Sequence, residues 1–232
     1  MGRFDYSELA HDYDESRYKG RKNSYINLVH KNCLTSLLPK DKTGKILDVG
    51  CGTGRGVLFL AEQGYHKVAG LDYTMKMLKV CSNKLADIKE VSLIRGDAGR
   101  LPFPDNSIDC IISLNFLHLF NNKEQKKFID EMARVLKPHG SLICEFDNYY
   151  RGIIAGKQTL KNNPTLNLNK YSDFKYLFSN PLKIQKIRGS SLPYIWRIFQ
   201  YITNIAVYIE KLSYVFPFLL IAPRFLIRAV KC

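Results

Sequence analysis

A chain of 232 residues is long enough for one large domain with a substantial core, and its hydrophobic fraction of 46% is ordinary for a globular protein. Six scattered cysteines include no C-x-x-C pair and no Cys/His cluster, which excludes the usual zinc spacings, so we predict no metal site. The net charge of +14 is concentrated in residues 151–232, whose 13 basic and 2 acidic side chains indicate either an anionic partner or a solvated basic face.

The first 40 residues are predicted to form an N-terminal helical cap. Their opening stretch, MGRFDYSELAHDYDE, is acidic and polar, which differs from the basic and apolar pattern of a signal peptide. We therefore expect a cytoplasmic protein.

Residues 41–150 alternate short apolar runs with helical ones, which is typical of consecutive βαβ units and a parallel sheet. Because these runs are apolar throughout, the sheet should be covered by helices on both faces. We expect one helix at Val57–Gln63, a second capped by Thr74, and a third that ends at Lys137-Pro138. The five strands are expected at Lys45–Gly50, Lys67–Asp72, Val91–Asp97, Ile108–Asn115 and Ser141–Phe146.

Residues 151–232 are predicted to complete the same single domain with two closing strands. Tyr171–Phe178 has a helical pattern, Leu182–Gly189 alternates apolar and basic residues as an edge strand does, and Arg224–Lys231 is strand-like. Residues 192–223 should form a helical insertion before the last strand, with uncharged runs of only 12 residues, too short to span a membrane. The predicted fold class is α/β, a doubly wound, mostly parallel, seven-stranded sheet.

The segment ILDVGCGTGRG (Ile46–Gly56) carries the most specific signal in the chain. Gly50, Gly52 and Gly54 follow Asp48 in the pattern acid-x-G-x-G-x-G. Glycine permits a sharp turn from strand to helix in which the backbone passes close to a ligand. The spacing fits neither the G-x-G-x-x-G dinucleotide fingerprint nor a phosphate-binding loop that ends in G-K-[ST].

Four further segments follow the order seen in one enzyme family: A-x-x-Y-D-x-x-R (Ala10–Arg17), GLDYTMKML (Gly70–Leu78), GDAGRLPFPDNSIDCIIS (Gly96–Ser113) and EMARVLKPHGSLICEF (Glu131–Phe146). With the glycine segment, they resemble class I S-adenosylmethionine-dependent methyltransferases. The likeness is strongest to the methyltransferase type 11 group, which includes ubiquinone- and menaquinone-pathway methylases. The resemblance covers roughly residues 5–146. It implies a Rossmann-like fold, S-adenosylmethionine as cofactor and S-adenosylhomocysteine as product.

The resemblance also implies which residues bind the cofactor. On the methionine side, Asp48 and the Leu114 carbonyl would contact the ammonium group, beside the backbone of Gly50, Cys51, Gly52 and Gly54. On the adenosine side, Asp72 would accept hydrogen bonds from both ribose hydroxyls, Tyr73 and Met77 would flank the adenine, and Asp97 with Ala98 would contact its amino edge. Tyr13 and Arg17 would close over the cofactor from the N-terminal helix.

Several of these residues have plainer interpretations. Asp72 can simply end a strand, Asp97 can be a turn residue, and Tyr13 with Arg17 can belong to an ordinary surface helix. Cys51 is expected to fill space rather than to act as a nucleophile. His139 stands where the family usually has glycine, and we expect a local turn with positive φ there.

A sulfonium methyl group is already electrophilic, so the enzyme mainly has to align an acceptor and exclude water. His118 is the best candidate for a general base, but packing near the pocket explains it more simply, and we assign no catalytic residue. No N-P-P-Y or Pro-Cys motif of nucleic-acid methylases is present. A small, lipid-like or quinone-like acceptor therefore fits best, and the aromatic, basic insertion would suit contact with an anionic membrane.

Two other hypotheses stay open. The basic C-terminal third can hold an RNA or protein substrate, which steeply salt-dependent binding would indicate. The chain can also be a non-catalytic module that binds the cofactor for regulation.

Overall fold

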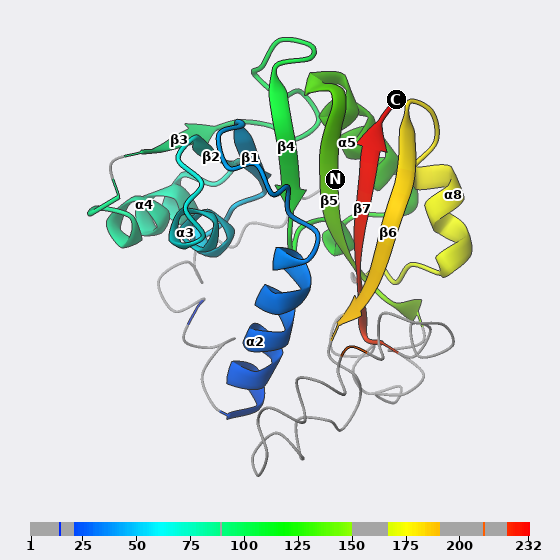
Figure 1. Ribbon diagram of the computed structural model, residues 1–232, viewed down its shortest axis with the longest axis horizontal. Coiled ribbons are helices and arrows are strands. Elements are labelled where there is room, and N and C mark those ends of the chain that lie inside the picture. The colour runs from blue at the N-terminus through cyan, green and yellow to red at the C-terminus, as the bar shows by residue number, and fades with distance from the viewer. Residues whose placement is uncertain (1–13, 15–20, 89, 150–166, 191–210, 212–221) are drawn as a thin grey trace.

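The computed structural model describes residues 14, 21–88, 90–149, 167–190, 211 and 222–232. Seven strands form one sheet in the order β3-β2-β1-β4-β5-β7-β6 (Figure 1). The first five pair in parallel, whereas β7 runs antiparallel to both of its neighbours. The strands are β1 Ile46–Val49, β2 Val68–Asp72, β3 Val91–Arg95, β4 Ile108–Ser113, β5 Leu136–Asp147, β6 Leu182–Ser190 and β7 Arg224–Lys231. The predicted doubly wound sheet is confirmed.

The helices cover both faces of this sheet, as predicted. They are α2 Arg21–Thr35, α3 Arg55–Glu62, α4 Met75–Lys84, α5 Asn122–Val135 and α8 Phe174–Leu177, with the 3-10 turns η1 Leu117–Leu119 and η2 Tyr171–Asp173. The first three helices share one core and α5 with α8 share the other.

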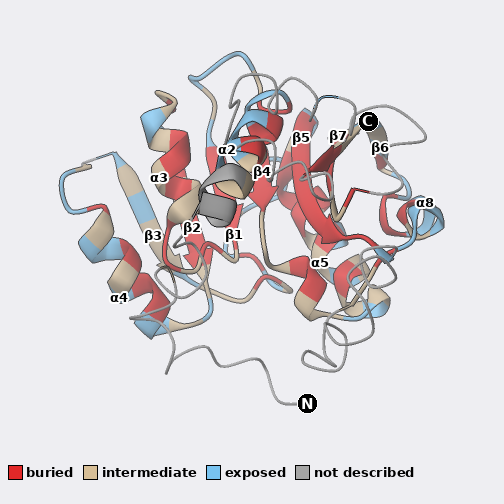
Figure 2. Cartoon of the chain, turned by 90° about the horizontal axis from the view of Figure 1, so that it is seen from below, coloured by how far each residue is buried: buried red, intermediate tan, exposed pale blue. Residues whose placement is uncertain are grey.

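Strand alternation explains the two cores, because successive side chains of a strand point to opposite faces. Figure 2 shows buried residues along the middle strands and on the helix sides that face them. The face under α2, α3 and α4 receives Ile46, Cys110, Ile112, Ile143 and Leu226. The face under α5 and α8 receives Leu47, Val49, Ile111, Leu142, Phe225 and Ile227.

The boundary between α5 and β5 differs from the prediction. The helix ends at Val135, and β5 begins at Leu136, so the Lys137-Pro138 pair lies inside the strand. Leu136 already has extended backbone angles, φ −67° and ψ 137°. The residue before a proline is driven out of the helical region, which forces the helix to end earlier. His139 has the expected positive φ, at 64°, but it lies inside β5 rather than in a separate turn.

The closing strands have the predicted positions. β6 is the edge strand, pairing with β7 from Leu182 to Ser190 with an irregularity between Ile184 and Lys186. The expected helix at Tyr171–Phe178 consists of η2 followed by the single turn α8. Most of the expected insertion at 192–223 lies outside the described residues, so membrane contact there stays a prediction. Within the described part of the chain, no helix is both long and apolar enough to cross a membrane.

Phe174 fastens α8 to the sheet, since its buried ring lies 5.2 Å from that of Phe146 and 5.4 Å from that of Phe225 between centroids. We expect Phe174→Ala to lower the free energy of unfolding by about 3–5 kcal/mol, because it leaves a cavity in this aromatic cluster. Urea unfolding measures the change. Tyr176→Ala in the same turn is the control, since Tyr176 is exposed and its loss should change stability by no more than about 0.5 kcal/mol. Equal losses in the two variants would contradict this account.

Candidate functional site

The loop after β1 depends on its glycines. Gly50, Gly52 and Gly54 all have positive φ, at 76°, 52° and 80°. A Cβ on Gly50 would lie 2.6 Å from the Phe116 ring, and one on Gly54 would lie 2.2 Å from Cys81 Sγ. A side chain at either position is therefore excluded by both backbone conformation and space. At Gly52 a Cβ would meet nothing within 4 Å, so this part of the backbone is open to a ligand.

The Asp72 carboxylate holds this loop in place. Its Oδ2 accepts a hydrogen bond of 2.9 Å from the Gly52 amide, and its Oδ1 accepts one of 2.8 Å from the Thr74 amide. Thr74 stands at the N-cap of α4 as predicted, but its own side chain makes no capping bond. Asp72 therefore ends β2 and also fixes the loop that follows β1. Each carboxylate oxygen has a second lone pair for a ligand.

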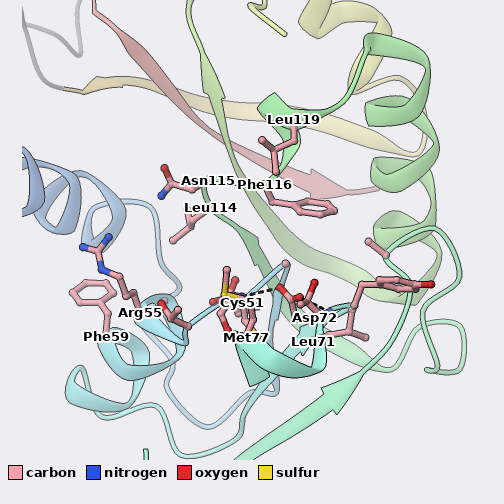
Figure 3. Close-up of a pocket in the computed structure, with 18 of the residues that line it drawn as sticks. Cys51, Arg55, Phe59, Leu71, Asp72, Met77, Leu114, Asn115, Phe116 and Leu119 are labelled. Carbon is pink, nitrogen blue, oxygen red and sulfur yellow. Dashed lines mark hydrogen bonds between the residues drawn. The ribbon is translucent and has the colours of Figure 1, made fainter. Parts of the chain in front are cut away.

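A cavity of about 1000 Å³ opens at the carboxyl ends of β1, β2 and β4. The strand order reverses at this point of the sheet, which is where open α/β sheets bind ligands. Figure 3 shows Cys51, Asp72 and Met77 on one side of the cavity and Leu114, Asn115 and Phe116 on the other. The sequence-predicted residues in its lining are Asp48, Gly50, Cys51, Gly52, Asp72, Tyr73, Met77, Asp97, Ala98 and Leu114.

Of the other three predicted site residues, Gly54 is described and is not in this lining. Gly54 is the N-cap of α3, behind the loop, and lies against Cys81. Tyr13 and Arg17 lie outside the described residues, so their closing role stays a prediction.

Asp48 is buried at the base of the cavity, and its Oδ1 has no hydrogen-bond partner among the described residues. A Cβ on Gly56 would lie 2.3 Å from Asp48 Oδ2, so the small residue makes room for the carboxyl group. Burial, followed by the negative charge of Asp72, raises the pKa of Asp48 to about 8. A carboxyl group in this state favours a cationic partner, which would compensate its charge.

The turn that follows β3 brings Asp97 to the cavity. Its Oδ1 accepts a hydrogen bond of 2.8 Å from the Gly99 amide. Asp97 is thus a turn residue and a lining residue at once, so the two sequence interpretations do not exclude each other.

Cys51 packs beside Cys81 beneath the loop. Its hydrogen bond with Cys81 and its burial raise the pKa of the Cys51 thiol well above its usual value. A buried thiol of raised pKa is a poor nucleophile, which favours the interpretation of Cys51 as a space-filling residue.

A set of polar contacts, which the sequence did not predict, ties the N-terminal segment to the glycine loop. Asp14 accepts a hydrogen bond of 2.9 Å from Thr53 Oγ1 and forms an ion pair with Lys84. Lys84 in turn donates to the Thr53 carbonyl at 2.8 Å. The three residues come from the N-terminus, the loop and the end of α4, so no local pattern in the sequence joins them.

A polar cluster around Glu145, also missed, lies at the opposite end of the cavity. Glu145 is buried on β5, where its Oε1 accepts 2.9 Å from Arg224 and its Oε2 accepts 2.9 Å from the Asn115 amide. His30 Nε2 lies 3.4 Å from Oε1. Burial opposes ionisation, but the charge of Arg224, then His30, holds the pKa of Glu145 well below its usual range. His30, Asn115 and Arg224 line the cavity.

His118, the sequence candidate for a general base, is buried in η1 and is not part of the cavity lining. It contributes to the low pKa of Glu145 instead. The interpretation of His118 as a packed histidine is therefore favoured.

An aromatic wall completes this end of the cavity. The rings of Phe116, Phe120 and Phe128 are in mutual contact, with centroids 4.8 to 5.5 Å apart, and all three line the cavity. Figure 3 shows Asn115 and Phe116 pointing to opposite sides. Asn115 allows this reversal because it has a positive φ of 52°. The cavity thus has an apolar wall and a polar one at the same end.

Comparison with known proteins shows what the central part of the chain is similar to. A family model described as a methyltransferase domain matches residues 47–144. A demethylmenaquinone methyltransferase of Staphylococcus epidermidis is 38% identical over 145 residues, which are 60% of this chain and 57% of that protein. One from Listeria welshimeri is 42% identical over 114 residues, 47% of each chain. The matched part thus spans about half the length of these curated relatives.

Solved structures agree on the fold. Magnesium protoporphyrin IX methyltransferase from Synechocystis, solved with bound SAH, has a TM-score of 0.70 at 17% identity and covers 98% of this chain and 96% of its own. Geranyl diphosphate C-methyltransferase from Streptomyces coelicolor has a TM-score of 0.62 at 15% identity, covering 87% of this chain and 76% of its own. The family model and the curated relatives confirm, for the matched residues, the resemblance to methyltransferases of the type 11 group that the sequence motifs indicated.

The contact between Gly54 and Cys81 can be tested by a double-mutant cycle. Gly54→Ala should lower the free energy of unfolding by about 2–4 kcal/mol, since it combines overpacking with a strained backbone. Adding Cys81→Ala removes the Sγ atom and should restore about 1–2 kcal/mol of that loss. Urea unfolding of the four proteins measures the coupling. If the changes in unfolding free energy caused by the two substitutions are strictly additive, the contact is contradicted.

Proposed function

Because residues 47–144 are a methyltransferase domain, we propose that this chain transfers a methyl group from S-adenosylmethionine to a small, apolar acceptor and releases S-adenosylhomocysteine. One observation carries the proposal. The glycine loop after β1 and the acidic end of β2 line a single cavity, and Asp72 joins them through its bond to the Gly52 amide.

The residues present fit this cofactor. The open backbone at Gly52 would lie against the methionine part, and the buried Asp48 carboxyl group, with the Leu114 carbonyl nearby, would face its ammonium. Asp72 would accept from the ribose hydroxyls, with Tyr73 and Met77 beside the adenine and Asp97 with Ala98 at its edge. When bound, the cofactor supplies an electrophilic methyl group on a sulfonium.

The chain's own contribution is to position the acceptor and exclude water. Phe116, Phe120 and Phe128 would pack against an apolar acceptor, while the Glu145 cluster faces its polar groups. Holding two reactants in line inside a closed site supplies much of the rate in such a displacement. The demethylmenaquinone methyltransferases among the relatives support an acceptor of this apolar kind.

The direct test incubates the protein with methyl-labelled S-adenosylmethionine and separated lipid, small-molecule, RNA and protein fractions. We expect label in the lipid or small-molecule fraction. We expect Asp72→Ala to transfer none and to bind S-adenosylhomocysteine at least about 100-fold more weakly by calorimetry, since two charge-assisted hydrogen bonds are lost.

Asp87→Ala is the matched control, because Asp87 is an exposed acid beyond the end of α4 and outside the cavity lining. It should leave binding and transfer unchanged. Label in the RNA or protein fraction would show that the acceptor belongs to that class instead. If the wild-type protein does not bind S-adenosylhomocysteine, the proposal is overturned.

The raised pKa of Asp48 predicts that cofactor binding depends on pH. With a pKa of about 8 it is protonated at pH 7 in the free protein, and the cofactor's ammonium would favour its ionised form. Binding should therefore release a proton, and affinity should rise by up to about tenfold per pH unit as pH increases toward 8. Calorimetry in buffers of different ionisation enthalpy counts the released protons. The Asp48→Asn variant should lose this release, and an unchanged proton count in that variant would contradict the assignment.

A further inference from the structure

The glycine loop is held at several points along α4. Before the first turn of this helix, Asp72 accepts hydrogen bonds from the Gly52 and Thr74 amides, at 2.9 and 2.8 Å. In the second half of the helix, the Sγ atom of the buried Cys81 lies where a side chain on Gly54 would have to be. The conformation of the loop therefore depends on α4 as well as on its own glycines.

Lys84, the last residue of α4, provides a further point of contact. Its Nζ atom donates a hydrogen bond of 2.8 Å to the Thr53 carbonyl and also forms an ion pair with Asp14. Asp14 in turn accepts a hydrogen bond of 2.9 Å from Thr53 Oγ1. The three residues thus contact one another pairwise, and we call them the tether. Thr53, only 3% exposed, is held by the tether at both its carbonyl and its hydroxyl group.

The tether lies beside the part of the loop that is open to a ligand. All three of its residues line the cavity, and Thr53 directly follows Gly52, where a Cβ would meet nothing within 4 Å. Glycine loses more conformational freedom on ordering than any other residue, so a loop with three glycines is costly to order when a ligand binds. A loop that is already ordered avoids this cost and binds more tightly. Holding Thr53 from two sides therefore favours binding at Gly52.

The position of Lys84 distinguishes it from the other lysines of the helix. Lys76 and Lys79 are exposed and lie outside the cavity lining. The side chain of Lys84 is only 24% exposed and that of Asp14 30%. An ion pair that solvent still reaches in part is weakened by dissolved salt, although less than a fully exposed pair.

We propose that Lys84 is a positioning residue for cofactor binding, which acts through Thr53 and Asp14 to hold the glycine loop in its binding conformation. Cofactor affinity then depends on ionic strength, because salt weakens the ion pair of the tether. This inference rests on the proposed function and adds to it a determinant of cofactor affinity. Since coupling between two sites is reciprocal, the bound cofactor strengthens the tether by the same factor.

The test is a calorimetric titration of the full chain with S-adenosylhomocysteine at two salt concentrations. At low salt, Lys84→Met should raise Kd about tenfold, because the charge-assisted hydrogen bond to the loop is lost while the aliphatic stem is largely retained. For the wild-type protein, raising NaCl from about 50 to about 500 mM should raise Kd about threefold. For Lys84→Met the same change of salt should raise Kd by less than about 1.5-fold.

Two further variants separate a role in binding from a merely structural one. Lys84→Arg keeps both the charge and a donor, so it should bind within about threefold of the wild type and keep the salt dependence. Asp14→Asn keeps an acceptor for Thr53 Oγ1 but removes the ion pair. It should therefore bind more weakly than the wild type at low salt and lose the salt dependence.

Lys79→Met is the matched control, since it replaces an exposed lysine of the same helix outside the cavity lining, and it should behave as the wild type. The proposal is overturned if Lys84→Met binds as tightly as the wild type, if wild-type affinity does not change with salt, or if Lys84→Arg binds no better than Lys84→Met. If Lys84→Met does not fold, the comparison of Asp14→Asn with the wild type decides. Failure of the proposed function is distinct, because the wild-type protein would then not bind S-adenosylhomocysteine at either salt concentration.

Discussion

The hydrogen bond from the Gly52 amide to Asp72 Oδ2 is the constraint on which the candidate site depends. It joins the loop after β1 to the end of β2, two segments that the parallel pairing of these strands already places side by side. The glycines allow the loop to turn at positive φ, and Phe116 and Cys81 fill the space that side chains on Gly50 and Gly54 would need. A ligand at Gly52 therefore meets bare backbone on one side and a fixed carboxylate on the other.

Each end of the cavity has a buried carboxyl group, and the pKa values of the two groups are shifted in opposite directions. Asp48 has no cationic partner in the described chain, and burial raises its pKa. Glu145 is equally buried, but Arg224 and His30 lower its pKa. Under the proposed function, the first carboxyl group would receive a positive charge only from the cofactor, whereas the second is already paired with the guanidinium of Arg224. Environment, not residue type, assigns the two roles.

The sequence by itself determined the sheet core and the glycine-loop end of the candidate site. Apolar runs with helical segments between them predict parallel strands, and the acid-x-G-x-G-x-G spacing predicts the loop, because both signals lie within a few neighbouring residues. Asp48, Asp72 and Asp97 were found for the same reason, since each stands at the carboxyl end of its own strand or just beyond it. The end of α5 was placed two residues late, because the extended conformation that precedes Pro138 begins at Leu136.

Only the tertiary structure decided the rest of the site. His30, Asn115, Glu145 and Arg224 come from four separate elements, and the tether of Asp14, Thr53 and Lys84 comes from three. Each of these residues is unremarkable in its own segment, and Asp14 and Lys84 are 70 residues apart in the sequence. Their chemistry arises from burial and from strand order, which places β7 next to β5 and so brings Arg224 to Glu145. Long-range proximity of this kind leaves no periodic or local pattern for a single sequence to show.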